Sequence, residues 1–291
     1  EDFRILAINP GSTSTKIAVY QNMNPVFVKN ITHPNEELAQ FEHVADQFHF
    51  RKEIIYKELE EADIEINKIQ AVVGRGGMLK PIASGVYQVN DAMKSDLYDH
   101  PIKEHASNLG GLIADDIARA LPDAKAYIAD PVVVDELDEI ARVSGHPLFK
   151  RISIFHALNQ KSIARQHAKS IMKHYEDLNL IIVHMGGGIT IGAHQKGKVI
   201  DVNQGLDGEG PFSPERSGTL PSGDLVRFCF SGKYSEKEVL KMVVGNGGIV
   251  AYLGTNSAYE AEQRALNGDE QAKFILEALA YQVAKSIGSM V

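Results

Sequence analysis

Two patterns of apolar positions alternate along the chain. Short apolar runs typical of strands cover residues 4–9 and 15–20, separated by a Gly-Ser turn, and a third run begins at Pro25. The sequence therefore predicts a hairpin or meander of β-strands at the start of the chain. Its first turn is unusually rich in Ser and Thr.

Longer stretches repeat their apolar residues every three or four positions, which is the spacing of one helix face. They predict helices over residues 36–62, 107–121 and 272–291. Between these stretches, strand patterns cover residues 71–74, 125–129 and 152–154. Strands that alternate with helices over most of the length predict an α/β fold.

The opening pattern recurs in the second half of the chain. An offset of 175 positions (180 − 5) places residues 180–184 on residues 5–9 and Gly186 on Gly11, and a strand pattern follows both glycines. The sequence thus predicts two halves that each begin with a strand, a tight turn and a second strand. Chance similarity between two hairpins is the alternative explanation.

Composition and charge exclude several classes of protein. Of the 291 residues, 44% are hydrophobic and 23% are charged, so two globular domains are expected and a disordered chain is not. The 38 acidic residues outnumber the 30 basic ones. The resulting net charge of −8 argues against nucleic acid or an anionic membrane surface as the partner.

Export and membrane insertion are not expected either. No apolar run approaches the length of about 18 residues that a membrane span needs, and the first residues lack the features of a signal peptide. The single cysteine, Cys229, has no partner for a disulfide within the chain, which favours a cytoplasmic location. The missing initiator Met and the final apolar-faced helix suggest a chain trimmed at both ends.

Two turns have the composition of phosphate-binding loops. The segment NPGSTSTK (residues 9–16) places an amide, four hydroxyls, a glycine and a lysine between two strands, groups that hold phosphate oxygens or metal-bound water. It lacks the Gly-Lys-Ser/Thr ending and the following helix of a Walker A loop. The segment HMGGG (residues 184–188) lets backbone approach a ligand closely, and continues as a strand, unlike a Rossmann turn. Ordinary hairpin turns are the alternative for both.

Four further side chains complete the candidate site. Arg75 lies between glycines at a strand end, Asp130 ends a strand before a proline, His156 follows the strand over 152–154, and Arg216 lies in a loop. Each has a structural alternative, such as a solvated arginine, a helix-capping aspartate or a core histidine. Taken together with the two turns, they are the groups that phosphoryl transfer requires.

The sequence resembles a known family. It is similar to the butyrate kinases and branched-chain fatty acid kinases within the acetate kinase family of acid kinases. The segments that carry the resemblance run in family order over nearly the whole chain. They are NPGSTSTK (9–16), VGRGG (73–77), HASNLGG (105–111), DP (130–131), FH (155–156), HMGGG (184–188) and ERSG (215–218).

The resemblance implies the fold of actin, sugar kinases and heat-shock ATPases, with two duplicated, ribonuclease H-like βββαβαβα domains and a cleft between them. On that basis we expect an N-terminal domain over residues 1–155, on the acid and phosphate side, and a second domain over residues 156–291, on the nucleotide side. The family's adenosine-binding glycine turn has no match before Val291. The second domain is therefore expected to be incomplete at its C-terminus, with the adenine-binding residues beyond Val291.

The resemblance also implies roles for individual residues, with ATP or ADP and Mg²⁺ as cofactors. The first phosphate turn corresponds to Asn9, Ser12, Ser14 and Lys16, and the second to His184, Gly186, Gly187 and Gly188. Asn9 and Asp130 correspond to residues near the metal, and His156 and Arg216 to residues that hold the transferred phosphoryl group. The acid-binding set is Arg75, Gly76, Gly77 and His105.

Two departures from acetate kinases favour the butyrate branch. Acetate kinases have an arginine three residues before a His-Gly-Gly, whereas here that position is Val72 and the arginine, Arg75, replaces the histidine. The role of carboxylate binder is therefore transferred to Arg75. Acetate kinases also have Gly-Asn-Gly in the second turn, where this chain has Gly186, Gly187 and Gly188, so backbone must hold the phosphate there.

These inferences predict an enzyme that phosphorylates butyrate or a similar short or branched carboxylic acid with ATP, and that runs in reverse from the acyl phosphate. An acetate or propionate kinase of the same family is the first alternative. The second is an actin-like nucleotide switch, which would not need an arginine such as Arg75 to hold a carboxylate. The family resemblance further suggests a homodimer or a larger homo-oligomer.

Overall fold

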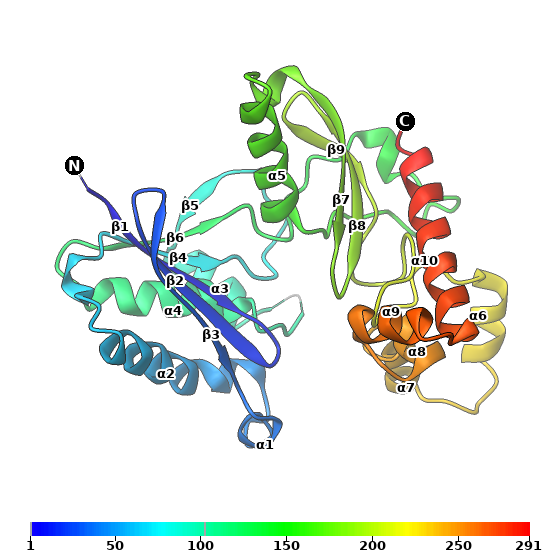
Figure 1. Cartoon of the computed structure of the whole chain (residues 1–291), viewed down its shortest axis with the longest axis horizontal. Coiled ribbons are helices and arrows are strands. Elements are labelled where there is room, and N and C mark those ends of the chain that lie inside the picture. The colour runs from blue at the N-terminus through cyan, green and yellow to red at the C-terminus, as the bar shows by residue number, and fades with distance from the viewer. Residues whose placement is uncertain (1, 102) are drawn as a thin grey trace. The chain divides into compact units, whose positions relative to one another are not determined.

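The computed structural model describes residues 2–101 and 103–291, which form two compact units, one that ends at Val134 and one over Asp135–Val291 (Figure 1). The division after Val134 precedes the boundary expected at residue 155. Residues 135–155 belong to the second unit because they are bonded to it. The Arg151 Nη1 donates to the Asp201 Oδ1 at 2.9 Å, and the Asp138 N–H donates to the Ile200 carbonyl at 2.9 Å.

The first unit is built on one six-stranded sheet. Its strands are β1 (Arg4–Pro10), β2 (Ser14–Gln21), β3 (Asn24–Thr32), β4 (Ala71–Arg75), β5 (Val86–Gln88) and β6 (Lys125–Ala129). They lie in the order β3-β2-β1-β4-β6-β5, with β1, β4 and β6 parallel and the other pairs antiparallel. The carboxyl ends of β1, β4 and β6 therefore meet at one edge of the sheet, where an open α/β sheet usually binds its ligand.

The first unit also contains helices. They are α1 (Asn35–Leu38), α2 (Phe48–Glu61), α3 (Asp91–Tyr98) and α4 (Asn108–Arg119). The helix predicted over 36–62 is wrong as one continuous element, because the Asp46 carboxylate accepts the His43 N–H at 3.0 Å and starts a new helical segment there. Helix α4 follows its prediction and buries its apolar face on β1, β4 and β6.

The second unit contains the antiparallel sheet β7-β8-β9, whose strands are β7 (Asn179–Met185), β8 (Ile189–Gln195) and β9 (Lys198–Val202). Its helices are α5 (Ala157–Ser170), α6 (Ser222–Cys229), α7 (Glu236–Val243), α8 (Ile249–Leu253), α9 (Ala258–Leu266) and α10 (Glu270–Gly288). The strand predicted over 152–154 does not form. In that segment, the Ile154 carbonyl accepts the N–H of Gly205 in a loop at 2.8 Å.

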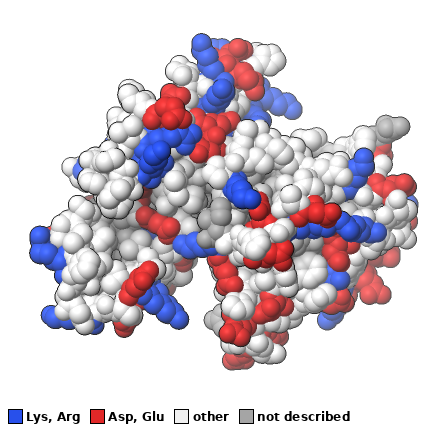
Figure 2. All heavy atoms as spheres, turned by 180° about the vertical axis from the view of Figure 1, so that it is seen from behind, with Lys and Arg blue, Asp and Glu red and all other residues white. Residues whose placement is uncertain are grey.

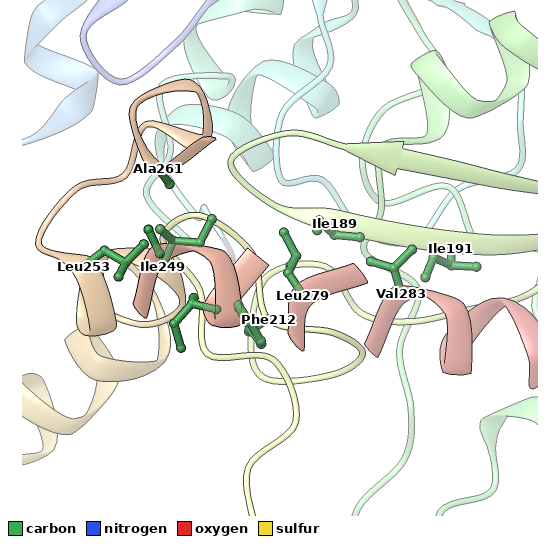
Figure 3. Packing of buried hydrophobic residues seen from close by; sticks show 10 residues of the cluster. Ile189, Ile191, Phe212, Ile249, Leu253, Ala261, Leu279 and Val283 are labelled. Carbon is green, nitrogen blue, oxygen red and sulfur yellow. The ribbon is translucent and has the colours of Figure 1, made fainter. Parts of the chain in front are cut away.

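Successive side chains of β8 point to opposite faces of the sheet, and each face packs against a different layer of the second unit. Ile189 and Ile191 face a core cluster that also contains Phe212 from a loop and Leu279 and Val283 from α10 (Figure 3). Thr190, between the two isoleucines, points to the opposite face. There its hydroxyl is bonded to a side chain of α5. β8 thus joins an apolar core on one side to a polar layer on the other.

The predicted repeat of the opening meander is present, with one correction. The offset of 175 holds for β1 and β7, but after the turn it becomes 174. At that offset Gln21↔Asn24 becomes Gln195↔Lys198, and the irregularity between Val19 and Tyr20 falls between Ala193 and His194. The second turn is one residue shorter than the first, and both strand registers are otherwise the same.

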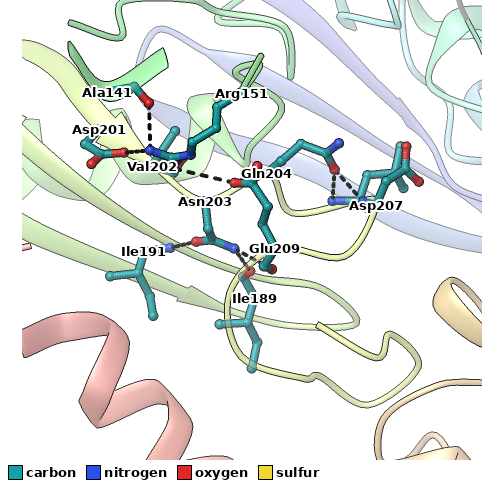
Figure 4. Close-up of polar contacts among 11 residues, drawn as sticks. Ala141, Arg151, Ile189, Ile191, Asp201, Val202, Asn203, Gln204, Asp207 and Glu209 are labelled. Carbon is teal, nitrogen blue, oxygen red and sulfur yellow. Dashed lines mark hydrogen bonds and ion pairs between the residues drawn. The ribbon is translucent and has the colours of Figure 1, made fainter. Parts of the chain in front are cut away.

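A polar network continues β9 past its last residue (Figure 4). The Asn203 side chain accepts the Ile191 N–H at 2.7 Å and donates to the Ile189 carbonyl at 3.0 Å, as a further strand residue would. The Gln204 Oε1 accepts the N–H groups of Leu206 and Asp207. These bonds fix the course of the loop that contains Gly205.

The surface carries both charges close together. On the face shown in Figure 2, Lys and Arg side chains lie among Asp and Glu side chains. Asp115, for example, forms ion pairs with Lys94 at 2.9 Å and with Arg119 at 2.8 Å. In the described part of the chain, no helix is both long and apolar enough to span a bilayer.

Candidate active site

Three predicted site residues stand at the ends of the three parallel strands of the first unit. Asn9 is the next-to-last residue of β1, Arg75 is the last residue of β4, and Asp130 directly follows β6. The Arg75 Nη1 donates to the Asn9 Oδ1 at 3.3 Å. The topology therefore places an amide, a guanidinium and a carboxylate on adjacent strand ends.

Asp130 is held in an unusual backbone conformation. Its φ of 37° lies in the left-handed region, which is uncommon for a residue other than glycine and is often found at functional sites. The side chain is 5% exposed, and its Oδ1 accepts the Ser84 hydroxyl at 2.6 Å and the Gly85 N–H at 2.9 Å. The strand end and the loop before β5 thus fix the carboxylate together.

Lys16 faces the same way as Asn9, because the two residues are directly opposite each other in the antiparallel pair β1-β2. Ser12 is exposed and Ser14 half-buried in the turn that joins these strands. The Gly11 N–H donates to the Ser14 carbonyl at 2.7 Å, which closes the turn. The amide, hydroxyl and ammonium groups predicted for phosphate binding are therefore gathered at one turn.

Arg51, which our sequence analysis missed, supports this turn from inside the protein. Its guanidinium donates to the Ser14 carbonyl at 3.0 Å, to the Ser12 carbonyl at 3.1 Å and to the Thr15 hydroxyl at 3.0 Å. The side chain is fully buried on α2, and burial lowers its pKa to about 10. The helical spacing of Arg51, Ile55 and Leu59 could have revealed an arginine in a core position.

The two glycines that are predicted to bind the acid are tightly packed. A Cβ on Gly76 would lie 2.5 Å from the Pro131 Cβ, and one on Gly77 would lie 2.5 Å from the Asn108 Oδ1. His105 precedes α4, and its Nδ1 accepts the Ser107 N–H at 3.1 Å. An Nδ1 that accepts leaves the proton of the neutral ring on Nε2. The structure gives these glycines a packing role, and their part in acid binding stays a prediction.

In the second unit, His156 and His184 lie face to face. Their ring centroids are 3.7 Å apart and the ring planes are inclined by 11°. The His156 Nδ1 lies 2.9 Å from the Thr190 Oγ1, and the His184 Nδ1 lies 2.9 Å from the Asn159 Oδ1. The structure therefore brings together two histidines that the sequence places 28 residues apart (184 − 156).

Arg216 lies directly over the glycine turn between β7 and β8. A Cβ on Gly188 would overlap the Arg216 Nη1, so only glycine leaves room for the guanidinium. The same nitrogen donates to the Gly205 carbonyl, while the buried Nε has no hydrogen-bond partner in the structure. Burial lowers the pKa of Arg216, although Glu215 and Asp207 oppose this effect. A buried cation with an unsatisfied donor favours an anionic ligand nearby.

Each unit thus gathers its own part of the predicted set. In the first unit, Asn9, Arg75 and Asp130 share one sheet edge, with Lys16 beside Asn9. In the second unit, a Cβ on Gly205 would lie 3.8 Å from the His156 Cε1, and the Gly205 carbonyl accepts from Arg216. This loop therefore links His156 to the arginine over the glycine turn.

Comparison with known proteins identifies relatives of the chain. The Acetokinase family model matches residues 148–291. Butyrate kinase 2 of Clostridium acetobutylicum is 57% identical over 287 residues, which are 99% of this chain and 80% of that protein. Butyrate kinase 1 of the same organism is 55% identical over 286 residues, which cover 98% of this chain and 80% of that protein.

Solved structures show the same fold. An acetate kinase from Porphyromonas gingivalis has a TM-score of 0.75 at 19% identity, over 99% of this chain and 79% of that one. A propionate kinase from Francisella tularensis has a TM-score of 0.74 at 21% identity, over 99% and 80%. The predicted resemblance is confirmed: the chain has the α/β fold of these kinases, and it belongs to the acetate kinase family.

Proposed function

We propose that the protein transfers the γ-phosphoryl group of ATP to the carboxylate of butyrate or a similar short or branched acid, and that it catalyses the reverse reaction with ADP. The observation that carries the proposal is the identity of 57% and 55% to two butyrate kinases over nearly the whole chain. A carboxylate kinase is a transferase, and it needs groups for an acid, for phosphates and for the charge that develops between them.

Arg75 is the proposed acid-binding residue. Its planar guanidinium can hold both oxygens of a carboxylate, which a point charge cannot do equally well. A short carboxylic acid is ionised at neutral pH, so its oxygen attacks phosphorus without a general base. Gly76, Gly77 and His105 would then shape the acid site around Arg75, and Pro131, which packs on Gly76, is a candidate wall residue.

Arg216 and His156 are the proposed residues for the transferred phosphoryl group. Negative charge spreads over the equatorial oxygens in the transition state, and fixed donors in a partly buried site stabilise it strongly. Arg216 supplies a buried cation, and His156 supplies a ring donor held by Thr190. The turns that contain Ser12, Ser14 and Lys16, and Gly186, Gly187 and Gly188 with His184, would hold the nucleotide phosphates.

Asn9 and Asp130 have the oxygen donors that Mg²⁺ prefers, an amide oxygen and a carboxylate, at the ends of β1 and β6, the two strands that flank β4 in one sheet. In the described chain, no group of three or more His, Cys, Asp or Glu side chains is placed to hold a metal ion. Mg²⁺ usually keeps several waters and phosphate oxygens as ligands, so two protein oxygens suffice. When bound, Mg²⁺ would neutralise charge on the phosphates.

Further proposals concern architecture and assembly. The repeated meander supports two duplicated actin-like domains, because strand register and irregularity recur at a constant offset. We also propose that the enzyme acts in the cytoplasm, as a homodimer or larger homo-oligomer. Light scattering on the purified protein would test the assembly.

A hydroxamate assay for acyl phosphate tests the proposed function across acetate, propionate, butyrate and isobutyrate. Each buried methylene is worth about 1–3 kcal/mol, so butyrate should exceed acetate by roughly 10²-fold or more in kcat/KM. Equal values for acetate and butyrate would favour an acetate or propionate kinase. Phosphate release from ATP without any acyl phosphate would instead indicate a nucleotide switch.

A further inference from the structure

Four buried side chains extend the hydrogen bonding of His156 into the second unit. The His156 Nδ1 and the Gln160 Nε2 each lie 2.9 Å from the Thr190 Oγ1. The Gln160 Oε1 lies 2.9 Å from the His194 Nε2, and the His194 Nδ1 lies 2.6 Å from the Tyr175 hydroxyl. These four side chains are at most 3% exposed, so water hardly competes for their bonds.

Secondary structure aligns these groups. His156 directly precedes α5 and Gln160 lies in its first turn, and both side chains reach the Thr190 hydroxyl. Thr190 and His194 project from β8 toward α5, opposite the face that Ile189 and Ile191 bury in the core. The polar layer of the second unit therefore runs as one line behind His156.

A backbone carbonyl determines which atoms donate and which accept in this series of hydrogen bonds. The Gln160 Nε2 also lies 3.1 Å from the Thr190 carbonyl oxygen, which can only accept. The amide nitrogen of Gln160 therefore faces Thr190, and its oxygen faces His194. Because an amide oxygen cannot donate, the His194 Nε2 must carry a proton.

The hydrogen bond at the Tyr175 end of this network agrees with this direction. Burial, and after it the Lys161 ammonium, lower the pKa of His194 to about 4. The ring of His194 is thus neutral at pH 7, and its one proton is on Nε2. Its Nδ1 then accepts a hydrogen bond from the Tyr175 hydroxyl.

The hydrogen bonds at the Thr190 end of the network determine which ring nitrogen of His156 carries the proton. The Thr190 hydroxyl oxygen accepts from Gln160, so the hydroxyl hydrogen is available for the His156 Nδ1. We infer that Thr190, Gln160 and His194 are positioning residues that fix the proton of neutral His156 on Nε2 and make that nitrogen a hydrogen-bond donor. The inference rests on the proposed function for one point only, that the Nε2 proton is directed at a phosphoryl oxygen.

The stacked partner explains why an uncharged donor suits this position. The His184 ring lies 3.7 Å from the His156 ring, and two imidazolium ions at that separation would repel each other strongly. A neutral ring with a fixed tautomer donates a hydrogen bond without that repulsion.

Nitrogen NMR tests the tautomer without reference to activity. In protein labelled with ¹⁵N at the histidine rings, long-range ¹H–¹⁵N spectra distinguish a protonated ring nitrogen from an unprotonated one. Assignments come from the spectra of the His156→Gln and His194→Gln variants. We expect a protonated Nε2 and an unprotonated Nδ1 for both histidines at pH 7. A proton on the His156 Nδ1 overturns the inference, whatever the enzyme does.

Variants of Thr190 then test the consequence. Thr190→Val keeps the shape but removes the hydroxyl, so the His156 proton should distribute over both nitrogens. We expect kcat to fall about 10- to 100-fold, as for other groups that orient a functional residue, with little change in KM. Thr190→Ser keeps the hydroxyl and should retain both the tautomer and most of kcat. An unchanged tautomer and kcat in Thr190→Val would contradict the inference.

Gln160 gives a second test with a matched control. Gln160→Met should disturb the His156 tautomer and lower kcat, whereas Gln166→Met, at an exposed position of the same helix, should change neither. Equal effects of the two variants would overturn the inference. If the wild-type protein forms no acyl phosphate, the proposed function fails, while the NMR spectrum still decides the tautomer.

Discussion

The first turns of the two meanders occupy the same place in the fold but are built differently. Between Pro10 and Thr15, the last residue pair of β1 and β2, residues 11–14 supply a glycine and three hydroxyl side chains. Between Met185 and Ile189, the last pair of β7 and β8, residues 186–188 are three glycines. Asn9 pairs with Lys16 in the first, and His184 pairs with Thr190 at the equivalent positions of the second. Equal strand register therefore does not require equal chemistry at the turn.

An arginine accompanies each turn from a different side. Arg51 lies beneath the first turn and donates hydrogen bonds to its backbone carbonyls, so it stabilises the loop itself. Arg216 lies over the second turn, in contact with Gly188, and its buried Nε has no partner in the structure. One arginine therefore serves the fold, and the other is suited to a ligand.

The largest expected effect concerns Arg216. Arg216→Ala should lower kcat by about 10³- to 10⁵-fold with a modest change in KM, because it removes charge stabilisation that is needed only in the transition state. Steady-state kinetics with butyrate and ATP measure this. Gly188→Ala should reproduce part of the loss, since its methyl group would overlap the guanidinium. A loss confined to KM for ATP would show that Arg216 binds nucleotide in the ground state.

Arg51 should affect stability before catalysis. Arg51→Met removes one donor from each of the Ser12 and Ser14 carbonyls, and should lower the free energy of unfolding by roughly 2–4 kcal/mol. Urea denaturation measures the change. Lys57→Met, at an exposed site of the same helix, is the control and should have little effect. A fully stable Arg51→Met variant would remove the distinction between the two arginines.

A change at Arg75 should affect binding of the acid and leave binding of ATP by the two turns intact. Arg75→Ala should raise KM for butyrate by about 10- to 100-fold and leave KM for ATP nearly unchanged, because a ground-state carboxylate contact is lost. Arg75→Lys should restore binding only in part, since an ammonium cannot make a forked contact. Titration of both substrates gives the two constants. Losses in ATP affinity alone would place the acid site elsewhere.

The smallest expected effect is a dependence of stability on pH, which comes from His33 behind the first turn. Burial, and after it Arg51, lower the pKa of His33 from 6.5 to about 4. Between these values the unfolded chain binds more protons than the folded one, so stability falls as the pH falls. From pH 7 to pH 5 the wild type should lose about 1–2 kcal/mol more than His33→Gln. Denaturation at both pH values measures this, and exposed His174→Gln should follow the wild type.

Sequence patterns predicted local elements and the residues at their ends. The strand over 125–129 agrees with β6 residue for residue, and the helix over 107–121 contains α4. Asp130 and Arg75 were recognised because strand ends, glycines and proline are local signals. Their adjacency follows from the parallel order β1-β4-β6.

The residues that sequence analysis missed depend on distant parts of the chain. Residues 152–154 have a strand pattern, yet a strand also needs a neighbouring strand, and the Ile154 carbonyl instead accepts the N–H of Gly205 in a loop. Arg51 supports a turn 37 positions earlier, and Thr190 serves His156 from another element. A single sequence does not reveal which residues meet across such separations.

The contact between β4 and α4 limits how this enzyme can be engineered. A Cβ on Gly74 would overlap the Gly110 carbonyl, and a Cβ on Gly110 would overlap the carbonyl of Arg75, so two backbones touch directly. The position of Arg75 is thus set by main-chain contact. Mutant libraries that aim at a new acid should therefore keep both glycines constant and vary Pro131, the proposed wall residue, so that Arg75, the proposed acid-binding residue, stays in place.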